Sequence, residues 1–298
     1  MEEIFKISDD VTVMRDGRVV GTYPTGELNG DKLISLMVGR DLTHRFPPVE
    51  SDIGDVCLKV KNLTAANPRS FKNISFELHK GEILGLGGLV GAQRTELVEA
   101  IFGIRGVAEG EISINGKTLK KLRPRHAIDA GIGLVTEDRR GSGIFPQLNI
   151  TANTAIASLG RYKTKIGLLD HKALGQAAMA QNAQLKTKTP SMNTLIQNLS
   201  GGNQQKVILS RWLMTLPDIL IMDEPTRGID VGAKYEIYMI MAELVKQGKA
   251  IIMVSSEMPE LIGMSHRVLV LCAGQLTGAL EKENISQEAI MRCATKFA

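Results

Sequence analysis

Two short segments of this chain carry residue types that could bind and activate a phosphate. The first, residues 199–205, reads Leu-Ser-Gly-Gly-Asn-Gln-Gln, and a hydroxyl followed by two glycines at a helix start leaves backbone N–H groups pointing at an anion. The second is Asp223-Glu224, which follows the apolar run 219–222 and so marks the carboxyl end of a buried strand, where open α/β sheets bind ligands. Glu224 lies 24 residues after Ser200. The alternative is an ordinary helix start and an ordinary strand end.

A third segment, residues 88–95 (Gly-Leu-Val-Gly-Ala-Gln-Arg-Thr), lies between an apolar strand and a helix, as a phosphate-binding loop does. Such loops have glycine and then lysine before the hydroxyl residue, but here Gln93 and Arg94 stand at those positions. Glycine lets the backbone approach phosphate, and lysine is a compact charge that the wider arginine fork does not reproduce. Thr95 keeps the hydroxyl that could hold magnesium. We expect loose nucleotide binding and poor hydrolysis; the alternative is a glycine-rich turn without a ligand.

The elements that must position these segments alternate between apolar strands and helices. Strands are expected at Val56–Val60, Ile74–Leu78, Glu82–Leu86, Gly131–Val135, Asp218–Met222, Ala250–Val254 and Arg267–Cys272. Helices are expected at Thr95–Phe102, Asn203–Thr215 and Ala233–Lys246, with a helical insert over residues 150–198 that breaks at Thr187, Pro190 and Ser191. Continuous apolar strands that alternate with helices predict an α/β fold, with a largely parallel sheet covered on both faces.

Residues 1–21 resemble residues 258–278 without a gap. Identities occur at positions 1, 3, 8, 11, 13, 17 and 21 of the first copy. Both copies predict a helical turn, a strand, a glycine turn, a second strand and a short helix, which in the first copy falls at residues 31–37. A shared hairpin shape could produce part of this match, but duplication explains ungapped identities better.

The repeat divides the chain into unequal parts. Residues 1–46 are expected to be the tail of a preceding domain whose body is absent from the chain. Residues 47–55, which begin Pro-Pro and are acidic, are expected to be a linker. Residues 56–298 then form a complete second domain, with the helical insert at about 150–200.

Composition limits the classes of partner. Of 298 residues, 43% are hydrophobic and 23% are charged, as in an ordinary globular protein. The net charge of +4 and the aromatic content of 4% give little support for nucleic-acid binding. Cys57, Cys272 and Cys293 are too far apart in the sequence to indicate a disulfide framework or a zinc site. No apolar run reaches the ~18 residues that a membrane span needs, so we expect a chain that does not itself cross a membrane.

With these motifs together, the chain resembles the ABC-type ATPases. Their signature motif is similar to residues 199–206, and their Walker B motif is similar to Asp223-Glu224. Further runs at residues 88–97, 136–140 and 255–260 make the whole chain similar to the C-terminal part of the tandem ATPases of monosaccharide importers, above all those for galactose-type sugars. The resemblance implies a P-loop nucleotide-binding domain with a helical subdomain, an ATPase acting as a translocase within a complex, and ATP and Mg²⁺ as cofactors.

The resemblance also implies roles for single residues. Glu224 would orient the attacking water, while Glu137 stands in place of the Q-loop glutamine and Ser256 in place of the switch histidine. Thr95 and, through water, Asp223 would hold Mg²⁺. Residues 228–230 would form the D-loop, which communicates between domains. The implied nucleotide-binding residues are Gly88, Gly91, Ala92, Gln93, Arg94, Thr95, Ser200, Gly201, Gly202 and Gln204.

Four departures from the family pattern fall in one half-site. Glu137 adds negative charge beside phosphates, Ser256 cannot take a proton as histidine does, and the glycine and lysine of the P-loop are replaced. In such dimers each nucleotide lies between the P-loop of one domain and the signature of the other. The resemblance therefore implies that Ser200 completes a competent site on another domain. The P-loop of this chain would form a degenerate site, and the isolated chain would be weakly active or inactive.

The resemblance implies three partners. These are membrane permease subunits docked near residues 137–146 and the insert, a complementary ABC domain (the missing N-terminal half or a dimer mate), and indirectly a periplasmic sugar-binding protein. The implied location is peripheral, on the cytoplasmic face of the cell membrane, and no nucleic acid is implied. Two other functions stay open. A non-catalytic nucleotide-sensing or interaction module would suit the altered P-loop, whereas a membrane-free tandem ATPase acting on ribosomes or DNA is disfavoured by the modest charge.

Overall fold

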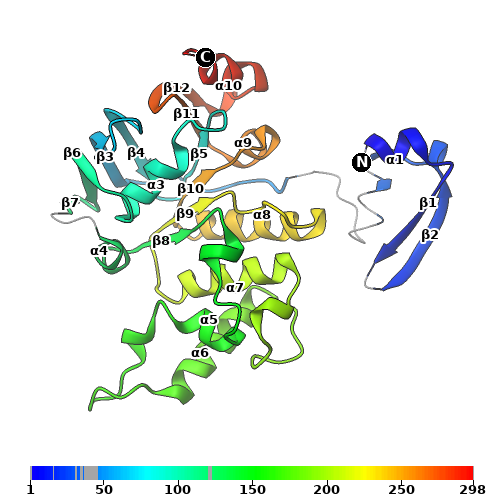
Figure 1. Cartoon of the computed structure of the whole chain (residues 1–298), viewed down its shortest axis with the longest axis horizontal. Coiled ribbons are helices and arrows are strands. Elements are labelled where there is room, and N and C mark those ends of the chain that lie inside the picture. Colours follow the sequence, from blue (N-terminus) through cyan, green and yellow to red (C-terminus); the bar gives the residue numbers. More distant parts are fainter. Residues whose placement is uncertain are drawn as a thin grey trace.

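The computed structural model describes residues 2–15, 17–30, 32–33, 36, 46–119 and 123–297. The described strands form a six-stranded sheet in the order β12-β11-β5-β10-β9-β8, a four-stranded sheet in the order β4-β3-β6-β7, and the hairpin β1-β2 (Figure 1). The strands are β1 Asp10–Arg15, β2 Arg18–Pro24, β3 Val56–Ala65, β4 Ile74–His79, β5 Ile83–Gly87, β6 Val107–Ile114, β7 Lys117–Thr118, β8 Ile132–Val135, β9 Ile219–Asp223, β10 Ala250–Val254, β11 Arg267–Cys272 and β12 Gln275–Glu281.

Along the sequence, most helices fall between strands of the six-stranded sheet. They are α1 Glu2–Ile7, α3 Arg94–Phe102, α4 Pro124–Asp129, α5 Ile150–Ala155, α6 His171–Gln184, α7 Gly201–Leu213, α8 Val231–Lys246, α9 Met258–Met264 and α10 Gln287–Ala294. None of the helices in the described part of the chain is long and apolar enough to cross a membrane. Most of the short helix expected at residues 31–37 lies outside the described residues.

The six-stranded sheet confirms the predicted parallel arrangement. Strand β10 pairs in parallel with both β5 and β9, β8 joins β9, and β11 joins β5, while β12 is an antiparallel edge strand. Every residue of β5, β9 and β10 is buried. Strands that are covered on both faces need apolar side chains at every position, which is why their sequences are continuous apolar runs.

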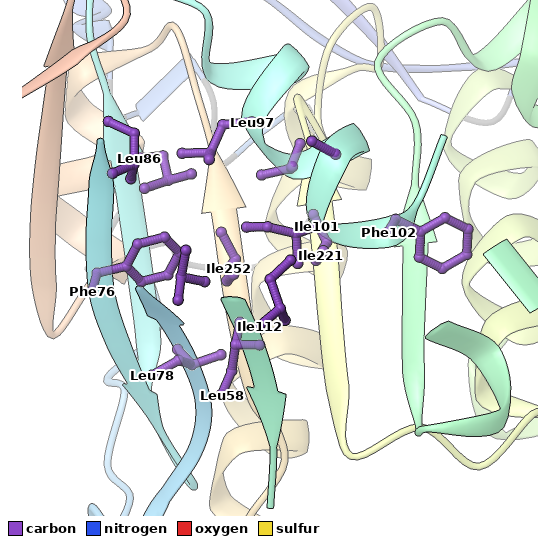
Figure 2. Close-up of a cluster of buried hydrophobic side chains, with 14 of the residues drawn as sticks. Leu58, Phe76, Leu78, Leu86, Leu97, Ile101, Phe102, Ile112, Ile221 and Ile252 are labelled. Carbon is purple, nitrogen blue, oxygen red and sulfur yellow. The ribbon is translucent and has the colours of Figure 1, made fainter. Parts of the chain in front are cut away.

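One face of this sheet packs against α3 and the four-stranded sheet. Figure 2 shows side chains of this core from both sheets and from α3: Leu58, Phe76, Leu78, Leu86, Leu97, Ile101, Phe102, Ile112, Ile221 and Ile252. Each buried aliphatic side chain contributes about 1.5–3 kcal/mol relative to exposure. The core therefore fixes α3, and with it the phosphate loop that precedes α3, against the carboxyl ends of the strands.

The four-stranded sheet was not foreseen as a separate unit. The expected strands at residues 56–60 and 74–78 form here, but they pair in an antiparallel sheet with β6 and not in the main sheet. Strand β6 escaped prediction because Glu109 and Glu111 are exposed around Gly110, so the segment lacks the apolar alternation of a strand. Two sheets, not the single predicted sheet, therefore enclose the core that contains α3.

The opposite face of the six-stranded sheet is covered by α7, α8, α9 and α10. Alternate strand residues, such as Leu220 and Ile251, point into this second core, where α7 contributes Val207, Ile208 and Leu209. Helix α8 begins two residues before the expected Ala233, because Asp230 is its N-cap and the Asp230 Oδ1 accepts a hydrogen bond from the Ala233 N–H at 2.9 Å. Helices α3 and α7 therefore pack on opposite faces of the same sheet.

The two copies of the sequence repeat have the same local structure. The bounds of β1 and β11 differ by 257 residues at both ends, as do those of β2 and β12. The register of each hairpin shifts at equivalent places, between Val13 and Met14 and between Val270 and Leu271. Each turn also contains a glycine at positive φ, Gly17 at 76° and Gly274 at 74°. The repeat extends from residue identities to register and turn conformation.

Phe46 and the expected linker, residues 47–55, pack along the part of the chain that follows them. The Phe46 ring lies 5.2 Å from the Tyr238 ring, centroid to centroid. The Ser51 hydroxyl donates to the Gly81 carbonyl at 2.6 Å, and the Gly54 N–H donates to the Lys80 carbonyl at 2.9 Å. These contacts attach the segment to the amino end of β5.

Candidate functional site

The phosphate loop, residues 88–95, has the conformation of a tight strand-to-helix turn. Gly88 has φ of 149° and Gly91 of 83°, while Gln93, a residue with a side chain, has φ of 73°. Positive φ costs roughly 1–2 kcal/mol for a residue other than glycine. Hydrogen bonds hold Gln93 there, since its Oε1 accepts from the Ser70 hydroxyl at 2.7 Å and its Nε2 donates to the Gly91 carbonyl at 3.1 Å. Gln93 therefore occupies a position that suits glycine.

Arg94 is directed into the protein. Its side chain is only 9% exposed, and Nη1 donates to the Ser255 carbonyl at 2.7 Å. The guanidinium of Arg94, the cation of the phosphate loop, is therefore hydrogen-bonded to the residue that follows β10. Gln93, the N-cap of α3, makes no side-chain capping bond, so the first N–H groups of this helix remain as donors for an anion.

Asp223 is buried at the carboxyl end of β9. Its Oδ1 has no hydrogen-bond partner among the described residues. Burial raises the pKa of this carboxyl group to about 7; a hydrogen bond from Thr95 opposes the rise, and the nearby charges of Glu137 and Glu224 add to it. An unpartnered carboxylate oxygen beside a threonine hydroxyl fits a hard divalent cation such as Mg²⁺, which takes oxygen ligands and commonly only one or two from protein carboxylates.

Glu224 is held in an uncommon conformation just beyond the strand. Its φ is 47°, its N–H donates to the Val254 carbonyl at 2.9 Å, and its Oε2 accepts from the Ser256 hydroxyl at 3.0 Å. Burial raises the pKa of Glu224, and the bond from Ser256 opposes that rise. The structure thus brings together two residues that the sequence placed 32 positions apart. Strained backbone of this kind concentrates at functional sites.

Glu137 is paired with a cation that the sequence analysis missed. Its carboxylate forms an ion pair with the Arg227 guanidinium, and both side chains are partly exposed. The added negative charge of Glu137 is therefore partly offset within the chain. Arg227 follows Glu224 by three residues, within the run 223–230 that carries the family resemblance, but the sequence assigns it no role.

The signature segment, residues 199–206, forms the start of α7. Ser200 is its N-cap, and the Ser200 Oγ accepts from the Asn203 Nδ2 at 2.9 Å. A Cβ on Gly201 would lie 3.0 Å from the Arg139 Nη2, and a Cβ on Gly202 would lie 2.4 Å from the Ala233 Cβ. Gly202 is therefore needed for the close contact with α8, whereas a Cβ at Gly201 would require only a small shift of its neighbours.

Gln204 lies inside the protein. It is 6% exposed, and its Nε2 donates to the Ile196 carbonyl at 3.2 Å. This bond holds the turn before the signature segment.

The predicted site residues fall into two groups. The phosphate loop, Asp223, Glu224 and Ser256 meet beyond the carboxyl ends of β5, β9 and β10, and the charge of Glu137 reaches Asp223. The signature segment begins α7, on the face of the sheet opposite α3 (Figure 1). The first group can hold a phosphate and a cation and can orient a nucleophile near Glu224. The second group presents the N–H groups at the start of α7.

Sequence analysis also missed a buried carboxylate next to this site. Glu260 is 1% exposed and accepts hydrogen bonds from Thr226, Tyr238 and Ser255. Its run, residues 255–260, was noted for resemblance alone. No pattern in the sequence marks it as buried, because glutamate is almost never fully buried unless it is paired.

Comparisons with known proteins identify the family of this chain. The ABC transporter family profile matches residues 71–227, just over half of the chain. The galactose/methyl galactoside import ATP-binding protein MglA of Clostridium tetani is 58% identical over 297 residues, which cover all of this chain and 59% of that protein. MglA of Escherichia coli K12 is 50% identical over 295 residues, which cover 99% of this chain and 58% of that protein. The chain thus spans about three fifths of the length of these relatives.

Solved structures share the fold. An ATP-binding cassette of an ABC transporter, MJ1267, has a TM-score of 0.70 at 19% identity, covering 81% of this chain and 98% of that one. The dimeric ABC transporter cassette MJ0796 has a TM-score of 0.66 at 21% identity, covering 76% of this chain and 98% of that one. With the matched family profile, the α/β cassette fold and the gathered site, the chain belongs to the ABC transporter family.

Proposed function

We propose that this chain is the C-terminal part of the ATP-binding subunit of an importer for galactose-type monosaccharides. The observation that carries the proposal is the meeting of Thr95, Asp223, Glu224 and Ser256 beside the phosphate loop. The names of the relatives, which are import ATP-binding proteins for galactose and methyl galactoside, support the sugar class. The matching hairpins at the two ends of the chain support the assignment of residues 1–46 to a preceding cassette.

In this proposal each group in the site has a defined task. The N–H groups that begin α3 bind phosphate oxygens, and Glu224 accepts a hydrogen bond from water and orients it. Ser256 holds the Glu224 carboxylate in place through its hydroxyl. Thr95 and Asp223 would hold Mg²⁺, which supplies positive charge to the phosphates. Phosphoryl transfer depends mainly on such positioning and charge stabilisation.

The proposed site is asymmetric between two domains. Helices α3 and α7, which follow the phosphate loop and the N-cap Ser200, pack on opposite faces of the sheet, so the signature segment is suited to a nucleotide held by a complementary cassette. Ser200 and the N–H groups that follow it would serve the competent site of that cassette. The P-loop here, with Gln93 strained and Arg94 directed inward, would form the degenerate site.

The proposed partners follow from this assignment. Permease subunits would dock near residues 137–146 and the helical insert, at the cytoplasmic face of the membrane, and a periplasmic sugar-binding protein would act through them. A non-catalytic nucleotide-sensing module is the second candidate, because the guanidinium of Arg94 is bonded to the Ser255 carbonyl in this structure.

Sugar uptake in cells that carry the complete tandem protein tests both candidates. Glu224→Gln is expected to lower galactose uptake less than the equivalent change in the other cassette, because Glu224 serves the weaker site. The matched control is Glu109→Gln, an exposed carboxylate on β6 that should leave uptake unchanged. An equal or larger loss with Glu224→Gln would contradict the asymmetry. Nucleotide binding without uptake of any monosaccharide would favour the sensing module.

A further inference from the structure

The carboxylate of Glu260, on α9, joins four separate elements. It accepts hydrogen bonds from the hydroxyls of Thr226, Tyr238 and Ser255, at 2.6 Å for Tyr238 and 2.8 Å for Ser255, and Lys234 Nζ lies 3.4 Å away. Thr226 belongs to the loop after Glu224, Lys234 and Tyr238 belong to α8, and Ser255 directly follows β10.

A buried carboxylate at this position destabilises the fold unless hydrogen-bond donors are fixed around it. Glu260 is 1% exposed, and a buried charge that lacks hydrogen bonds costs several kcal/mol. Burial and the charge of Glu260 raise the pKa of the Tyr238 hydroxyl, which therefore remains protonated and a donor. Charge-assisted hydrogen bonds are roughly twice as strong as neutral ones, so the carboxylate holds its donors firmly.

The same cluster reaches the phosphate loop through one residue. The Ser255 hydroxyl donates to the Glu260 Oε2, while the Ser255 carbonyl accepts from the Arg94 Nη1 at 2.7 Å. Arg94 is the first residue of α3. The hydrogen-bonded path Arg94–Ser255–Glu260–Thr226 therefore runs from the phosphate loop to the loop of residues 226–230.

We infer that Glu260 is a positioning residue that couples the phosphate loop to residues 226–230. A phosphate forms charge-assisted bonds with a guanidinium that are stronger than a bond to a neutral carbonyl. Phosphate near α3 would draw Arg94 away from Ser255, and the loss of that bond is transmitted through the Ser255 hydroxyl and Glu260 to Thr226. The identity of the phosphate ligand rests on the proposed function, but the hydrogen-bonded path does not.

Hydrogen–deuterium exchange of the purified chain tests the coupling without any ligand. Arg94→Met removes the bond to Ser255 and should speed exchange of the amides of residues 226–230 by about tenfold, the loss of one charged hydrogen bond. Glu260→Gln should speed the same amides. In the double variant, Arg94→Met should add nothing further, because the path is already broken.

A second buried carboxylate, Glu82, provides a control that distinguishes coupling through Glu260 from general destabilisation of the fold. Glu82 is also 1% exposed and is paired with Arg267, with Nε and Oε1 2.7 Å apart, at the amino end of β5. In a Glu82→Gln background, Arg94→Met should keep its full effect on residues 226–230. Additive effects of Arg94→Met and Glu260→Gln would overturn the inference, as would unchanged exchange in Arg94→Met.

A second variant protects the test if Glu260→Gln fails to fold. Ser255→Ala removes the hydroxyl link to Glu260 but keeps the carbonyl that accepts from Arg94. The cycle of Arg94→Met with Ser255→Ala should be non-additive in the same way, and additive effects here too would overturn the inference.

A nucleotide arm distinguishes failure of the inference from failure of the proposed function. With saturating Mg²⁺ and a non-hydrolysable ATP analogue, exchange at residues 226–230 should change in the wild type. It should not change in Glu260→Gln, even though the analogue binds with an affinity within about threefold of wild type. If the wild type binds no analogue, the proposed function fails, while the ligand-free cycle still decides the coupling.

Discussion

At the scale of single residues, Gln93 and Arg94 distinguish this phosphate loop from one with glycine and lysine at the same positions. Gln93 has a left-handed backbone conformation that glycine adopts without cost, and Arg94 satisfies its guanidinium inside the protein. Both substitutions preserve the turn and the helix that follows. What they change is the backbone and the charge that remain available to a phosphate.

Restoring the common residues should strengthen nucleotide binding. The double change Gln93→Gly with Arg94→Lys is expected to raise the affinity for Mg-ATP by about tenfold, because lysine reaches phosphates as a compact charge and glycine relieves the positive φ. Titration calorimetry measures the change. Arg105→Lys, beyond the carboxyl end of α3, is the control for an arginine-to-lysine change and should have no effect. Unchanged affinity in the double variant would mean that other residues weaken the loop.

His266 makes stability depend on pH. Its Nδ1 accepts a hydrogen bond from the Ile83 N–H at 2.9 Å, which requires that nitrogen to be unprotonated. Burial lowers the pKa of His266 below 6.5; Glu82 opposes this shift and Lys282 adds to it. Between the folded-state pKa and 6.5 the unfolded chain binds more protons. The free energy of unfolding should therefore fall as the pH drops from 7.5 to 5, by at most about 1.4 kcal/mol per pH unit.

Urea unfolding across that pH range checks the prediction. His266→Gln should flatten the pH dependence, while His171→Gln, at an exposed position on α6, should leave it unchanged. An identical slope in wild type and His266→Gln would rule out this residue as the source.

At the scale of elements, the close approach of α7 and α8 depends on Gly202. Gly202→Ala would place its Cβ 2.4 Å from the Ala233 Cβ, so one helix must shift. We expect a loss of about 1–3 kcal/mol in the free energy of unfolding, the usual cost of overpacking. The control is Gly175→Ala inside α6, where no atom lies within 4 Å and alanine should stabilise by about 0.5–1 kcal/mol. Chemical denaturation measures both, and equal effects would refute the packing argument.

The predictability of elements followed the strength of their local signals. The β9 and β10 runs were foreseen to within one residue, because buried parallel strands are continuously apolar. Strand β6 was not foreseen, because its exposed charges hide its period. Glu260 was noted without a role, because its four partners come from segments that only the folded chain brings together. The pairing of Glu137 with Arg227 escaped prediction for the same reason.

At the scale of the whole molecule, the proposed function assigns to one chain the halves of two different nucleotide sites. Helix α3, which follows the phosphate loop, and helix α7, which begins in the signature segment, pack on opposite faces of one sheet. The isolated chain is therefore expected to release phosphate from ATP at no more than about a tenth of the rate of a complete tandem protein. A coupled phosphate-release assay measures both rates. Vigorous hydrolysis by the chain alone would refute the asymmetric assignment.

The first hairpin has a consequence for behaviour in solution. In the second copy, β11 lies between β12 and β5, whereas among the described residues β1 is hydrogen-bonded to β2 alone. One side of β1 therefore presents a row of N–H and C=O groups of the kind that templates the addition of another strand. Its counterpart satisfies these groups within the sheet. Among the described residues, the hairpin is thus one segment where the colloidal stability of the chain depends on an unpaired backbone edge.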